Sequence, residues 1–249
     1  SSLFFRKMSH FLYFWRAYPY NQNMKTYNSD FSLSELPSIL KSLYYEDYGV
    51  YGFEKILAIF LTAIKIIFPM FWIRNRSKNK GYAFRNTMLE LYLIFKCTVL
   101  FMILKMWWFG NFGLAITLYF LTDIILYLMG IMFLPSMYNH NSNFNKNFLH
   151  LLLNLTEIVF GFSILYLATS ALSMANGAVP NWIDAIYFSI VTFATIGYGD
   201  ITTATHAGKL LVSGQVIISF LFVTIIVSRF IFQKNTHKNL EWENDQKLD

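Results

Sequence analysis

The sequence AIYFSIVTFATIGYGD occupies residues 185–200 and lies between two long apolar segments, 148–172 and 208–232. Its first half belongs to a short apolar stretch, residues 182–194, that is too short to cross a bilayer, because a spanning helix needs about 20 residues. Asn181 and Asp184 stand where a helix N-cap and a first-turn carboxylate are favoured. The sequence therefore predicts a short helix that enters the membrane and turns back through a glycine-containing loop.

The rest of the chain has the composition of a membrane protein. Of its 249 residues, 55% are hydrophobic and 14% charged, whereas soluble proteins carry about 25% charged residues. Blocks of apolar residues long enough to cross the bilayer predict five spans, at residues 54–73, 88–108, 111–134, 148–172 and 208–232. We expect an all-α membrane protein with about five transmembrane helices, or six if the N-terminal segment also crosses, and a re-entrant helix and loop between the last two.

Charge distribution predicts the orientation of the chain. The loop at residues 74–87 contains five basic residues, whereas residues 173–207 contain none. The positive-inside rule then places the basic loop and the C-terminus in the cytoplasm of a multi-pass cell-membrane protein. We interpret the net charge of +6 as a topology signal, so no nucleic-acid partner is expected; anionic lipid bound at the loop is the alternative function of its charge.

The apolar blocks divide the chain into four parts. Residues 1–53 are predicted to form a peripheral or interfacial segment, and residues 54–134 a three-helix transmembrane domain. Residues 148–232 contain the two spans that flank the short helix. Residues 233–249 are predicted to be a short cytoplasmic tail.

Thr195 to Asp200, TIGYGD, resembles the signature sequence of the tetrameric potassium channels, and it stands in the helix–loop–helix context that this signature requires. The resemblance covers residues 148–232 and makes them a pore domain: outer helix, pore helix, selectivity filter and inner helix. It implies that K⁺ is the permeant ion, without a cofactor, and that four copies surround the pore. It assigns the ion-binding filter to Thr195, Ile196, Gly197, Tyr198 and Gly199, with K⁺ held at the carbonyls of the first four.

The chemistry of such a filter can be stated from elementary principles. Backbone carbonyls can replace the water around K⁺ without adding a charge that would trap the ion. Successive carbonyls point the same way only if alternate residues adopt dihedral angles that side chains resist, which explains Gly197 and Gly199.

The support of the filter departs from the family pattern. Many members hold the residue matching Asp200 through a Trp or a Glu of the pore helix, and those positions are assigned here to Phe188 and Val191, which cannot hydrogen-bond a carboxylate. Ala194 replaces a common threonine. We therefore predict a loosely held filter that inactivates readily, unless Tyr187 or water replaces the missing bond.

Two features bear on gating. Counted from Gly208, the glycine hinge of the family falls at Ser219, and Gly214 is the only interior glycine of this span, either a hinge or a site of close packing. Residues 54–134 resemble a voltage-sensing domain only by position. Residues 111–134 contain no Lys or Arg, whereas a sensor needs about 3 or 4 gating charges per subunit, so strong voltage dependence is not expected.

Four charged residues lie well inside the predicted spans, away from their ends, namely Lys65, Lys96, Asp123 and Glu157. Because the second and third spans form a hairpin, we predict a buried ion pair between Lys96 and Asp123, which either fixes helix packing or acts as a switch or residual sensor. Glu157 is predicted to contact the helices of the pore domain or a water-filled crevice.

The favoured function is a potassium-selective channel that conducts passively. The alternatives are a membrane subunit of a coupled K⁺ uptake system and a non-selective cation channel. We do not expect an enzyme: an intramembrane protease needs paired catalytic groups at one depth, and Asp123 is already assigned to Lys96.

Overall fold

The computed structural model describes residues 37–38, 40–41, 53–76, 82–106, 110–133, 144–174 and 177–245. Their elements are α3 (Phe53–Ile64), a 3₁₀ turn η1 (Lys65–Ile67), α4 (Pro69–Arg76), α5 (Tyr82–Met106), α6 (Gly110–Phe133), α8 (Phe144–Ala168), β1 (Leu172–Met174), α9 (Trp182–Phe193), β2 (Ile201–Thr203) and α10 (His206–Asp245). The predicted all-α membrane fold is confirmed, with two very short strands added. Apart from residues 37–38, 40–41 and Phe53, the predicted interfacial segment 1–53 lies outside the described residues.

Four of the five predicted spans are single helices of spanning length. The apolar stretches run over Asn86–Met106, Gly110–Ile131, Leu149–Ala168 and His206–Val227, and α9 is a shorter apolar helix, as predicted. The prediction of a single helix through residues 54–73 was wrong. There the chain forms α3, η1 and α4 in succession.

Proline causes this interruption. Pro69 has no backbone N–H, so it cannot donate a helical hydrogen bond to the carbonyl four residues earlier, and the helix restarts at Pro69 itself. Two carbonyls near the break find side-chain donors instead. Trp72 Nε1 donates to Ile66 O at 2.9 Å, and Tyr119 Oη of α6 donates to Ile67 O at 3.1 Å.

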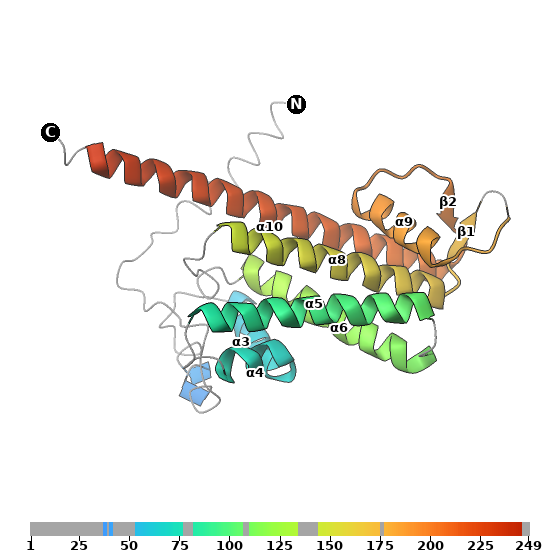
Figure 1. The fold of residues 1–249 in the computed structure, drawn as a ribbon, viewed down its shortest axis with the longest axis horizontal. Helices are drawn as coiled ribbons and strands as arrows, with labels where there is room; N and C mark the ends of the chain where they lie inside the picture. Colours follow the sequence, from blue (N-terminus) through green and yellow to red (C-terminus); the bar gives the residue numbers. More distant parts are fainter. Residues whose placement is uncertain are drawn as a thin grey trace.

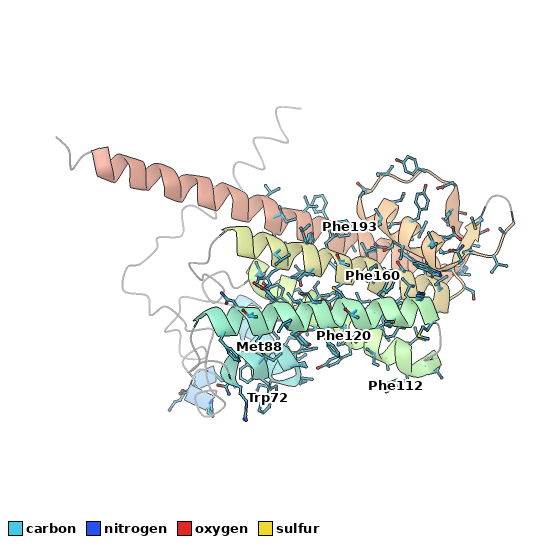
Figure 2. All side chains as sticks on the ribbon, viewed as in Figure 1. Trp72, Met88, Phe112, Phe120, Phe160 and Phe193 are labelled. Atoms are coloured by element: carbon cyan, nitrogen blue, oxygen red, sulfur yellow. The ribbon has the colours of Figure 1, made fainter. Side chains whose placement is uncertain are left out.

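Helix α8 is the centre of the bundle (Figure 1). It contacts α5 and α6, which belong to the predicted non-pore domain, and also α9 and α10. Gly161 allows α6 to approach closely, because a Cβ atom at this position would lie 2.6 Å from Leu121 Cδ2. Between α5 and α8, the rings of Phe101 and Phe160 pack with their centroids 5.8 Å apart. Figure 2 labels Phe160.

The strands connect the end of α8 to the segment after the glycine loop. β1 pairs antiparallel with β2, and Leu172 faces Thr203 in the register. Gly208, at the start of α10, packs against this strand pair: a Cβ atom there would lie 2.8 Å from the Cβ of Ala171 and 3.0 Å from that of Thr203. The strands, α9 and the start of α10 therefore gather at one end of the bundle, opposite the C-terminus (Figure 1).

Candidate functional site

The short helix α9 begins at a capping box. Asn181 Oδ1 accepts hydrogen bonds from the backbone N–H groups of Ile183 at 2.7 Å and Asp184 at 3.1 Å, while Asp184 Oδ2 accepts from Asn181 N at 2.8 Å. Asn181 was predicted as the N-cap of this helix, and Asp184 as a carboxylate in its first turn. The reciprocal bonds satisfy donors that no preceding helical turn can satisfy, so they fix where the helix starts.

The glycine-containing loop follows directly from the end of α9. Thr195 N donates to Thr192 O and Ile196 N donates to Val191 O, both at 3.0 Å. Beyond these bonds the backbone alternates: Thr195, Gly197 and Gly199 have φ values of 55°, 64° and 82°. Left-handed backbone at every second residue was predicted for the two glycines; Thr195 adopts it as well, despite the cost for a β-branched residue.

The loop presents its residues to the outside of the chain. Thr195 through Asp200 are all exposed, and Ile196 and Tyr198 are 52% and 68% exposed although both are apolar or aromatic. By contrast, Phe188 and Val191 of α9 are buried behind the loop. In a single chain, the residues of the loop therefore face away from the bundle and are not enclosed by other parts of the same chain.

Asp200 is held by Tyr187, which was predicted, with water, as a possible replacement for the missing Trp or Glu. Tyr187 Oη donates to Asp200 Oδ2 at 2.7 Å. This hydrogen bond holds the pKa of the Asp200 carboxyl below its ordinary value and raises the pKa of Tyr187. Phe188 faces inward, where its ring meets that of Tyr166 edge-on at 5.0 Å. The predicted loose support is therefore replaced by a direct bond.

A buried network behind the loop was missed by the sequence reasoning. Gln215 of α10 is fully buried; its Oε1 accepts from Tyr166 Oη of α8 at 2.7 Å, and its Nε2 donates to both Ser189 O and Ser189 Oγ of α9 at 2.9 Å. Ser189 Oγ in turn donates to Val159 O of α8 at 3.0 Å. The only signal in the sequence was a glutamine inside an apolar span. The network ties α9 to both neighbouring helices.

Comparisons with known proteins agree with this geometry. Residues 152–233, which hold most of α8, all of α9, the loop and much of α10, match a family model described as "Ion channel". This segment is therefore similar to the ion channel family. The channel domain is about one third of the chain.

Similar proteins are potassium channels. The chain is 56% identical over 48 residues to "Two pore potassium channel c" of Oryza sativa subsp. japonica, covering 19% of this chain and 10% of that protein. It is 50% identical over 40 residues to the "Hyperpolarization-activated voltage-gated potassium channel" of Methanocaldococcus jannaschii, covering 16% of this chain and 19% of that protein. It is 40% identical over 43 residues to "Potassium channel protein kcv" of Paramecium bursaria Chlorella virus 1, covering 17% of this chain and 46% of that protein. The matched stretches thus span less than half the length of each relative. No solved structure matches the chain.

The predicted gating residues lie in an unbroken part of the channel domain. α10 is one helix from His206 to Asp245, so it is unbroken at Gly214 and Ser219 and continues into the predicted tail. A Cβ atom at Gly214 would meet no atom within 4 Å, which removes close packing within one chain as the reason for this glycine. Ser219 Oγ donates within the helix, to Gln215 O at 2.8 Å. Their roles in gating stay predictions.

The predicted ion pair joins α5 to α6. Lys96 Nζ donates to Asp123 Oδ2 at 2.8 Å, and the ammonium group lies 5.4 Å from the ring centroids of both Tyr92 and Phe120. Figure 2 labels Phe120, which lies on α6 beside the pair. The side chain of Lys65 is outside the described residues.

Glu157 belongs to the same charge cluster. Its Oε1 lies 2.6 Å from Lys96 Nζ, so the residue contacts a cation of α5 rather than only the pore-domain helices or a water-filled crevice. The sequence could not show this because α5 and α8 are far apart along the chain. The three residues form one charged contact between the channel domain and the helices that precede it.

Proposed function

We propose that the chain is a potassium-selective channel that conducts K⁺ passively through a pore formed by four copies. The observation that carries this proposal is the loop at 195–199, where left-handed φ angles at alternate residues follow directly from a capped helix. Such a backbone can direct successive carbonyls toward one axis. The carbonyls of Thr195, Ile196, Gly197 and Tyr198 would then replace the water around K⁺, with Gly199 completing the turn.

A homotetramer is the assembly that the open filter favours. The filter residues are exposed in one chain, and a ring of carbonyls needs further copies around the axis. Exposed apolar side chains on α9 and α10, among them Ile190 and Phe220, supply surface for contacts with neighbouring copies or lipid. Each α9 would direct the negative end of its dipole toward the axis, where it favours a cation.

The remaining features support a channel without strong voltage dependence. Among its described residues, α6 contains no Lys or Arg, and Lys96 of α5 contacts the carboxyl groups of both Asp123 and Glu157. A cytoplasmic C-terminus and anionic lipid at the 74–87 loop follow from the basic charge alone. Residues 77–81 of that loop lie outside the described residues.

Reversal potentials test the proposal. The full chain, reconstituted in lipid bilayers with opposed K⁺ and Na⁺ gradients, is expected to reverse close to the K⁺ equilibrium potential and to carry current without an energy source. A reversal near zero would identify a non-selective cation channel. A requirement for a coupled ion or nucleotide would indicate an uptake subunit instead.

A variant with a damaged filter is the control for leak. Gly199→Ala places a side chain at φ 82°, where L residues are strained, so the K⁺ current should disappear. Gly177→Ala is the matched variant, since it has φ 72° but lies between β1 and α9, outside the filter. If Gly199→Ala left K⁺ selectivity intact, the assignment of the filter would fail.

A further inference from the structure

The charge cluster of Lys96, Asp123 and Glu157 contains one cation and two acidic side chains. It lies near the middle of three helices of spanning length, α5, α6 and α8. Lys96 is 2% exposed and Glu157 is 0% exposed within a single chain, so their burial does not depend on contacts with lipid or with other copies. With all three groups ionised, the cluster would hold a net charge of −1 in a medium of low dielectric constant.

The two carboxyl groups are held differently. Asp123 accepts a well-formed hydrogen bond from Lys96, and its side chain is 10% exposed. Glu157 Oε1 is close to the same ammonium group, yet neither carboxyl oxygen of Glu157 has a hydrogen-bond partner among the described residues. Ionisation is therefore better compensated at Asp123 than at Glu157.

Other groups near Glu157 do not supply a balancing positive charge. Besides Lys96, α5 places Tyr92 and Cys97 beside the cluster, and Cys97 Sγ donates to Leu153 O of α8 at 3.4 Å. On α8 itself, His150 lies about two helical turns before Glu157. No ion pair of the described residues joins Glu157 to α9 or α10.

We propose that Glu157 is a proton-binding site, whose carboxyl group holds a proton at neutral pH while Lys96 and Asp123 form the ion pair. Burial of an uncompensated charge is far more costly than burial of a neutral carboxyl group that lacks one hydrogen bond. A proton on Glu157 leaves one positive and one negative charge in the cluster. This site lies where α5 and α6 pack against the outer helix of the channel domain, and it does not depend on potassium conduction.

Infrared spectroscopy of the reconstituted full chain tests the site directly. At neutral pH the wild-type protein should show the carbonyl stretching band of a protonated carboxylic acid, and labelling glutamate carboxyls with carbon-13 should shift that band. Glu157→Gln should abolish it, whereas Glu90→Gln, which removes a half-buried carboxyl of α5 outside the cluster, should leave it unchanged. Absence of the band in the wild type, or its persistence in Glu157→Gln, would overturn the proposal.

Thermal unfolding gives a second measurement. Glu157→Gln is a neutral isostere, so its unfolding midpoint at neutral pH should match that of the wild type. At alkaline pH the wild type loses the proton and gains a buried negative charge, so its midpoint should fall below that of Glu157→Gln. A variant that folds but is much less stable than the wild type at neutral pH would show that the native group is an ionised partner of Lys96, and would overturn the proposal. The wild-type infrared band decides the question even if the variant fails to fold.

Discussion

Replacing Gln215 by leucine should loosen the attachment of α9 to the helices around it. The substitution removes three hydrogen bonds, one from Tyr166 Oη and two to Ser189, all buried. Hydrogen bonds between membrane helices contribute on average about 0.6 kcal/mol each and at most about 1.7 kcal/mol. Three average bonds predict a loss of about 2 kcal/mol, which for a protein of this size corresponds to roughly 4–8 °C in the unfolding midpoint.

The loss has an identifiable origin. After Gln215→Leu, Ser189 Oγ still donates to Val159 O, but the Tyr166 hydroxyl is left buried without its acceptor, which by itself costs about 1–3 kcal/mol. Tyr166→Phe removes that hydroxyl. The double variant should therefore lose less stability than the two single variants together, with a coupling energy of about 0.6–1.7 kcal/mol.

Thermal unfolding in lipid nanodiscs and K⁺ efflux from vesicles would measure the two consequences, stability and support of the filter. Gln215→Leu should lower both the unfolding midpoint and the sustained K⁺ flux. Ser213→Ala is the matched control, since this hydroxyl donates within α10, to Lys209 O at 2.9 Å. Additive effects of the Gln215 and Tyr166 variants, or a wild-type midpoint in Gln215→Leu, would refute the role of the network.

Three other predictions concern the filter and the charges. Tyr187→Phe removes the bond to Asp200 and should hasten the decay of K⁺ current. Because that bond holds the pKa of Asp200 below its ordinary value, its stabilising effect is present at neutral pH and is lost as the pH falls through the lowered pKa, so the unfolding midpoints of wild type and variant should converge in acid. Gly199→Ala should abolish K⁺ current at unchanged membrane insertion, measured by electrophysiology and surface labelling; a normal current would contradict the strain argued from its φ angle. Lys96→Met should destabilise the protein by about 3–5 kcal/mol, because it leaves Asp123 buried without its cation. Thermal unfolding of Lys96→Met alone and combined with Asp123→Asn checks this, and the double variant should regain part of the lost stability.

Local sequence patterns were sufficient where a structural requirement depends on neighbouring residues. Asn181 is the expected N-cap and Asp184 the expected first-turn carboxylate, and the capping box that they form involves only residues three apart. Gly197 and Gly199 adopt left-handed backbone because the loop needs it and glycine permits it. The pairing of Lys96 with Asp123 was accessible as well, since a two-helix hairpin brings the midpoints of its helices together.

Contacts between distant segments could not be predicted in the same way. The sequence left open whether Tyr187 or water would hold Asp200 in place of Phe188 and Val191, because the rotation of α9 about its axis decides which side chain reaches the carboxylate. The break before Pro69 is a local feature. It was missed because an apolar composition can equally describe one long helix or two short ones.

The sequence alone established a membrane protein with a filter-like loop after a short helix, because apolar length, capping residues and glycine positions act over a few residues at a time. Only the tertiary structure brought Gln215 to Tyr166 and Ser189, and Glu157 to Lys96. Each of these contacts joins helices whose relative position and rotation follow from packing of the whole bundle. The charges and amides buried in the spans acquire a role only once their partners on other helices are known.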